Sequence, residues 1–367
     1  MKYTSDTISS KVFRLSFLAT LSVVLIHSNT LEGRYEPSWA VWVGNWIGYL
    51  QHWAVPYFFV VAGFFFDRGY ASAERKTIDF WKSKVSSLLV PYLIWGCLWG
   101  GLILTPIKCY VNLKAGIDCW QGTPLETMSF FPIADRLLGI TVTAPPNGAL
   151  WFVRELILFF LIAPVWRWIR KRGPFVIPLA CVLLLCWSFP MMNGFGVEHI
   201  LGVNFKAMGF GYLLLGMSIS LFRLENLKCP MWMACLCLAF WAGTAHHAIY
   251  VQEIVGVNLS SPIWLFLFKM SPIPLLVFIW TVFEYVPFPV SARVASLAFW
   301  IYCMHHPVTS IMGAIGHMVL GRSLTGEALR MVLVFGGTAV VCIVFGYALK
   351  IRCNRLYAVL IGGRTER

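Results

Sequence analysis

The chain has 367 residues, of which 59% are apolar and only 12% are charged, and its mean hydropathy is +0.73. These values exclude a soluble globular protein, because too few polar residues remain to cover its surface. The formal net charge is +13. The basic residues fall in short clusters between apolar runs rather than along one face, so we attribute them to membrane topology and expect no nucleic-acid partner.

Apolar runs long enough to cross a bilayer, which takes about 20 residues, recur along the whole chain. The sequence therefore predicts an all-α polytopic membrane protein, a bundle of about ten transmembrane helices that forms one domain over residues 1–367. A long extracytoplasmic loop is expected at 108–147. The predicted crossings are 15–31, 44–66, 86–107, 149–166, 174–192, 205–222, 230–250, 262–284, 294–318 and 330–349.

The distribution of Lys and Arg sets the orientation. If the N-terminus is inside, most of the 29 Lys and Arg residues fall in inner segments, as the positive-inside rule requires. An even number of crossings returns the C-terminus to the same side, so both termini are predicted to be cytoplasmic. Most of the 11 cysteines lie inside apolar runs without metal-ligand spacing, and we expect them to be packing residues and no metal to be bound.

This orientation places all eight histidines in the outer half of the bundle. At 1.5 Å per helical residue, His27, His52 and His305 lie at depths of about 20 Å from the inner boundary. Arg154 and Glu155 reach a similar depth. Ionisable residues this deep are costly unless they pair or face water, so the layer predicts a functional site. Each histidine can instead be a packing residue, and Arg154 with Glu155 can be a structural ion pair.

The adjacent residues His305 and His306 point about 100° apart on a helix, so we expect that they cannot both face the same cavity. One of the two is expected to be structural. His246 and His247 lie further out and are expected in the outer interface.

Five segments resemble, in order, the successive blocks of the membrane acyltransferase-3 family. They are 17–27 (FLATLSVVLIH), 57–66 (YFFVVAGFFF), 88–95 (LLVPYLIW), 150–164 (LWFVRELILFFLIAP) and 296–307 (SLAFWIYCMHHP). The segment 355–364 (RLYAVLIGGR) is similar to the tail of the family's shorter members, which carry no appended soluble domain. The resemblance thus runs from near residue 13 to the end.

The resemblance implies transfer of an acyl group, commonly acetyl, from cytoplasmic acyl-CoA to a hydroxyl of a cell-envelope sugar, polysaccharide or lipid-linked glycan. It also implies a multi-pass protein of the bacterial cytoplasmic (inner) membrane. His27 occupies the position of the family's essential histidine and is the expected catalytic base, since imidazole titrates near neutral pH. Glu155 is a candidate to orient His27. Arg154 is the first candidate oxyanion donor, and His305 is a further catalytic candidate.

The expected acyl-CoA site lies at the inner face, where cationic side chains would meet the phosphates. Its candidates are Arg14, Arg75, Lys76, Lys82 and Lys84; a purely topogenic charge cluster is the alternative. The sequence departs from the family's pattern at Ser16 and Ser87, where basic residues are usual. Arg14 and Lys82 are the nearest basic substitutes.

Trp151, His52 and His306 are expected to bind the acceptor substrate. Two other classes remain open. A helix bundle with a buried polar layer also suits a transporter or flippase for a lipid-linked saccharide, which broken helices and inverted repeats would favour. The chain can also be a scaffold subunit with a vestigial site, as the Ser16 and Ser87 departures allow.

Overall fold

The computed structural model describes residues 5–31, 39–97, 138–139, 147–187, 198–200, 203–253, 262–286, 290–320 and 323–363. The first half contains α1 (Ser5–Ser28), α2 (Trp39–Gln51), α3 (Ala54–Phe66), η1 (Asp67–Ala71), α4 (Thr77–Lys84), η2 (Val85–Leu89), α5 (Val90–Ile94), η5 (Gly148–Leu150), α9 (Trp151–Leu161), α10 (Ala163–Lys171) and α11 (Val176–Trp187). The second half contains β1 (Glu198–Ile200), β2 (Val203–Phe205), α12 (Ala207–Leu221), η6 (Leu224–Asn226), α13 (Met231–Glu253), α14 (Pro262–Met270), α15 (Pro272–Tyr285), α16 (Ala292–Ala295), α17 (Ala298–Leu320), α18 (Leu324–Arg352) and α19 (Asn354–Leu360).

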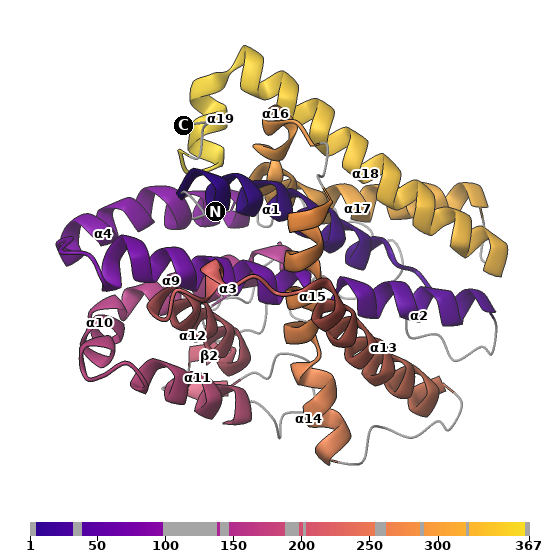
Figure 1. Ribbon diagram of the computed structural model, residues 1–367. Helices are drawn as coiled ribbons and strands as arrows, with labels where there is room; N and C mark the ends of the chain where they lie inside the picture. Colours follow the sequence, from indigo (N-terminus) through magenta and orange to yellow (C-terminus); the bar gives the residue numbers. More distant parts are fainter. Residues whose placement is uncertain are drawn as a thin grey trace.

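The predicted helical architecture is confirmed, apart from one short hairpin in which β1 pairs antiparallel with β2. Helix α1 packs against α3 on one side and α17 on the other, and α18 lies along α17 (Figure 1). The described helices share one extensive apolar core that includes residues from α1 to α19. Helix α1 begins and α19 ends at the same end of the bundle, on the left in Figure 1, where α4 and α10 also lie.

Five helical stretches are long and apolar enough to cross a membrane: Ile8–Ser28, Val41–Ala71, Met231–Val251, Phe266–Tyr285 and Leu324–Arg352. Joined at a bend, α9 and α10 make a sixth. These coincide with six of the ten predicted crossings. The predicted crossings at 174–192 and 205–222 correspond to the shorter apolar helices α11 and α12. The chain is thus a multi-pass helical membrane protein, whereas the count of ten and the side of each terminus stay predictions. Most of the predicted outer loop, 108–137 and 140–146, lies outside the described residues.

Glycines bring α3 and α12 into direct backbone contact. A Cβ added to Gly63 would lie 1.8 Å from the carbonyl oxygen of Leu213, and one added to Gly216 would lie 1.9 Å from that of Val60. Small residues allow this approach, which is a common basis of helix association in membranes. The backbones of α3 and α12 therefore approach each other closely at Gly63 and Gly216.

A bend of 58° separates α9 from α10. Pro164 has no backbone N–H, so the carbonyl of Phe160, four residues earlier, loses its helical donor. The indole of Trp81 donates to that carbonyl at 2.9 Å, and the indole of Trp166 donates to the carbonyl of Phe159 at 3.1 Å. Two indoles thus donate to carbonyls at the bend, and the backbone N–H of Ile162 also donates to the Phe160 carbonyl.

Candidate active site

Three histidines converge where α1 ends beside α17. The His27 ring centroid lies 5.2 Å from that of His305 and 5.3 Å from that of His306. We call these three residues the histidine cluster. His27 and His305, predicted at similar depths, thus lie side by side. The His27 ring contacts both His305 and His306, and the expectation that these two do not both face the same cavity stays a prediction.

His305 is fully buried, and its Nδ1 lies 2.7 Å from the carbonyl oxygen of Tyr302 and 3.2 Å from that of Ile301. A carbonyl oxygen only accepts, so Nδ1 must carry the proton in these contacts. Nε2 then keeps its lone pair. Among the described residues Nε2 has no hydrogen-bond partner. The backbone of α17 therefore fixes a tautomer of His305 that presents a basic nitrogen beside the His27 ring.

The segment before α9 is attached to α17 at the histidine cluster. Asn147 is fully buried and donates from Nδ2 to the carbonyl of Cys303 at 3.1 Å. The hydroxyl of Tyr302 donates to the carbonyl of Ala149. A Cβ added to Gly148 would lie 3.2 Å from Nε2 of His306. Sequence reasoning missed Asn147; its position between Pro146 and Gly148, at the start of a family-like block, was the available signal.

Arg154 and Glu155 form an ion pair of 2.8 Å and are nearly or fully buried. Arg154 also donates to the carbonyl of Gly139 at 2.5 Å, and the second oxygen of Glu155 accepts from the backbone N–H of Lys206 at 2.9 Å. Both oxygens of Glu155 thus have partners other than His27. The predicted pairing of Glu155 with His27 is not formed in this structure, and the contacts match the alternative of a structural ion pair, here one that ties α9 to the start of α12.

The predicted acceptor residues do not all meet. His306 belongs to the histidine cluster, but the ring contacts of His52 are with Tyr49, at 5.2 Å, and Phe268, at 6.0 Å. The Trp151 ring lies 3.7 Å from Nζ of Lys206 in a cation–π contact. Lys206 is not among the site residues that the sequence predicts. His52 thus belongs to an aromatic cluster of α2 and α14, and Trp151 to the group around Lys206.

Two of the five predicted donor-binding residues line a common pocket. Arg75 and Lys84 border a cavity of about 180 Å³ whose other walls include Phe80 and Phe160. Nζ of Lys84 lies 4.5 Å from the Phe160 ring and 5.2 Å from the Phe80 ring. The other three, Arg14, Lys76 and Lys82, are exposed and are not among the residues that line this cavity. The structure thus brings Arg75 and Lys84 to one cavity, and their role in donor binding stays a prediction.

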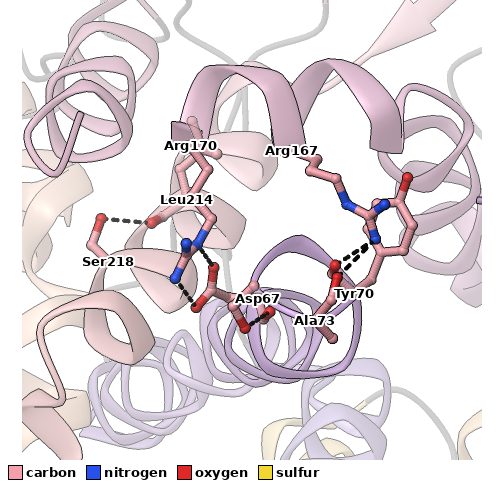
Figure 2. Close-up of polar contacts among 8 residues, drawn as sticks. Asp67, Tyr70, Ala73, Arg167, Arg170, Leu214 and Ser218 are labelled. Carbon is pink, nitrogen blue, oxygen red and sulfur yellow. Dashed lines mark hydrogen bonds and ion pairs between the residues drawn. The ribbon is translucent and has the colours of Figure 1, made fainter. Parts of the chain in front are cut away.

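The turn that leads to this pocket is held by two arginines of α10 (Figure 2). Nη2 of Arg167 donates to the carbonyls of Tyr70, Ala73 and Arg75 at 2.6, 3.3 and 2.7 Å, and its guanidinium stacks 3.6 Å from the Tyr70 ring. Arg170 forms an ion pair with the buried Asp67 at the start of η1.

Within the described ranges, no group of three or more His, Cys, Asp and Glu side chains is arranged to hold a metal ion.

The chain is similar in sequence to known proteins. Residues 15–347 match the family model of the acyltransferase domain Acyl_transf_3. The chain is 25% identical over 330 residues to the succinoglycan biosynthesis protein ExoH of Rhizobium meliloti (strain 1021), a match that covers 82% of this chain and 78% of the relative. No solved structure matches. Because the family model covers most of the chain, from α1 to α18, and includes all three members of the histidine cluster, this protein belongs to the membrane acyltransferase-3 family.

Proposed function

We propose that this protein is an O-acyltransferase that moves an acyl group, acetyl in the first instance, from cytoplasmic acyl-CoA to a hydroxyl of a cell-envelope glycan. His27 is the catalytic base. The observation that carries the proposal is the convergence of His27 with His305 and His306 in a chain that belongs to an acyltransferase family. His27 is exposed, as a base that meets an acceptor must be, whereas His305 is buried behind it.

The proposed reaction exchanges a thioester for an oxygen ester. His27 takes the proton of the acceptor hydroxyl as its oxygen attacks the thioester carbonyl. The carbon–sulfur bond then breaks, and the thiolate of CoA leaves and receives the proton. His305, with its Nδ1 proton committed to the backbone, keeps the polar environment of His27 fixed. Arg154 is already engaged with Gly139 and Glu155, so its role as an oxyanion donor stays a prediction.

The charges of the inner face support acyl-CoA as the donor, and the relative supports a glycan as the acceptor. Arg75 and Lys84, two cations that line one cavity, suit the phosphates of CoA, with the exposed residues Arg14, Lys76 and Lys82 adding positive charge at the inner face. A relative named for succinoglycan biosynthesis supports a polysaccharide or a lipid-linked glycan as the acceptor. We place the protein in the bacterial cytoplasmic membrane, with the donor inside and the histidine cluster in the outer half.

The test is transfer of radiolabelled acetyl from acetyl-CoA to glycan in membranes that contain the protein. His27→Ala is expected to reduce transfer at least a hundredfold, since a positioned general base contributes about 10²- to 10⁴-fold. His247→Ala is the matched control, because its ring stacks on Trp264 at 3.9 Å, away from the histidine cluster. Wild-type transfer by the His27 variant would remove His27 from the mechanism. No acetyl transfer by the wild-type protein to any glycan would remove the proposed activity itself.

One feature favours transport as a second candidate. The break of 58° between α9 and α10 is the kind of interrupted helix that transporters place near a substrate site. A flippase for a lipid-linked saccharide would move its substrate without an acyl donor, and the same membranes would then show glycan translocation that is independent of acetyl-CoA.

A further inference from the structure

A second cavity, of about 460 Å³, lies at the end of the bundle that the sequence predicts to be inner. Three arginines line it: Arg68 from η1, Arg170 from α10 and Arg223 from the turn that follows α12. Its volume falls within the range of about 300–1,000 Å³ that is typical of small-molecule sites. Neither the proposed donor site nor the histidine cluster shares these arginines.

Carboxylates hold two of the arginines in place. Asp67 and Glu225 are both buried; Asp67 pairs with Arg170, and Glu225 pairs with Arg68. The guanidinium of Arg68 also lies 4.3 Å from the Phe64 ring. A guanidinium has five N–H donors, and one carboxylate uses at most two or three of them. Both arginines therefore keep fixed donors for a further acceptor.

Arg223 adds a positive charge that these carboxylates do not balance. Its side chain is exposed, and among the described residues no Asp or Glu forms a salt bridge with it. Among the described residues, Arg223 is the one non-glycine residue with a left-handed backbone conformation, with φ of 54°. Such backbone positions are costly for residues with a side chain and tend to occur at functional sites. The wall of this cavity thus holds three guanidinium groups against two carboxylates, which favours an anion.

The cavity is far from the histidine cluster. Ile8, which lines the cavity, and His27 lie on the same helix α1, 19 residues and about 28 Å apart at 1.5 Å per residue. That distance is about the thickness of the hydrocarbon core of a bilayer. Beside the cavity, Phe222 and Leu224 are 39% and 42% exposed. Cations and exposed apolar side chains therefore meet at the end of the bundle that the sequence predicts to be inner.

We propose that this cavity binds the phosphate of an anionic phospholipid of the inner leaflet, with Arg68, Arg170 and Arg223 as donors to the phosphate oxygens and the acyl chains lying against Phe222 and Leu224. Arginines suit phosphate because their planar N–H groups can donate in pairs. Basic pockets between membrane helices on the cytoplasmic side are known to take anionic lipid head groups. The apolar rim favours a lipid over a soluble phosphate ester, which would need no such surface.

The test uses the purified full-length protein in neutral detergent, with thermal unfolding followed as phosphatidylglycerol is added. We expect a saturable rise in Tm with phosphatidylglycerol and a much smaller rise with phosphatidylcholine. Arg223→Asn removes the charge, while asparagine tolerates the left-handed backbone, so the turn is retained. This variant is expected to need about tenfold more phosphatidylglycerol for the same rise, as loss of one charge-assisted hydrogen bond predicts.

The matched control is Arg352→Ala, which removes an exposed arginine at the end of α18 that does not line the cavity. Its lipid response should equal that of the wild type. Equal responses of the Arg223 variant and the wild type would overturn the proposal. Equal stabilisation by the two lipids would do the same. A rise in Tm with inorganic phosphate alone, lost in the Arg223 variant, would overturn the lipid assignment in favour of a soluble phosphate ester.

Discussion

Replacing Gly63 by alanine tests the close contact between α3 and α12. The new Cβ would lie 1.8 Å from the carbonyl oxygen of Leu213, whereas an ordinary contact begins near 3.4 Å. Helices α3 and α12 would have to separate by about 1.6 Å. The clash is with backbone, so no side-chain rotation can relieve it.

The size of the effect follows from two opposing contributions. Overpacking typically costs about 1–3 kcal/mol, and a clash with rigid backbone belongs at the upper end. Alanine is favoured over glycine within a helix by about 0.5–1 kcal/mol. We therefore expect Gly63→Ala to lower the free energy of unfolding by about 2 kcal/mol. Gly243→Ala is the matched control: Gly243 lies within α13, a Cβ there would meet nothing within 4 Å, and only the helical gain should appear.

Thermal unfolding of the two variants in the same detergent measures the difference. Gly63→Ala should unfold several degrees below the wild type and Gly243→Ala at or slightly above it. If both variants unfold at the same temperature, α3 and α12 do not pack as closely as the structure shows. Gly216→Ala, with its Cβ 1.9 Å from the carbonyl of Val60, should behave like Gly63→Ala.

Two further variants test the polar contacts of α9 and α10. Glu155→Gln leaves the buried Arg154 without its counter-charge and should lower the free energy of unfolding by about 3 kcal/mol, which thermal unfolding measures. Replacing both residues by apolar ones of similar size should recover much of this loss. Arg167→Lys puts the charge on a shorter side chain without the guanidinium plane that stacks on Tyr70, so it cannot keep that stacking and reach the same three carbonyls. Trypsin should therefore cleave faster after Arg75 than in the wild type, whereas Arg172→Lys, at an arginine that stacks on Trp168, should leave the rate unchanged. Equal cleavage in both variants would contradict the role given to Arg167.

Much of the histidine cluster was predictable because depth in a membrane can be counted along a helix. The number of residues between an inner anchor and a histidine placed His27 and His305 at similar heights, and the structure brings their rings to 5.2 Å. Rotation about the helix axis and the choice of neighbouring helices are not encoded in that count. For this reason His52, which the same count predicts at a similar depth, lies instead beside Tyr49 and Phe268.

Partners of buried charges were harder to predict than their depth. Glu155 was expected to reach another helix, but its nearest cation is the adjacent Arg154, and its second oxygen accepts from a backbone N–H. Backbone groups carry no signal in the amino-acid pattern. Likewise, the basic clusters of the inner segments indicated topology, but not that Asp67 and Glu225 would hold Arg170 and Arg68 around a cavity.

The bend at Pro164 has a mechanical consequence. Helix α9 follows the short segment that Asn147 attaches to α17, whereas α10 grips the η1 turn through Arg167 and Arg170. The bend lies between these two attachments, and the Phe160 carbonyl there accepts from the Trp81 indole and from the backbone N–H of Ile162, not from the residue four positions on. If the angle between α9 and α10 changes, the η1 turn held by α10 can move while the segment that Asn147 attaches to α17 stays in place.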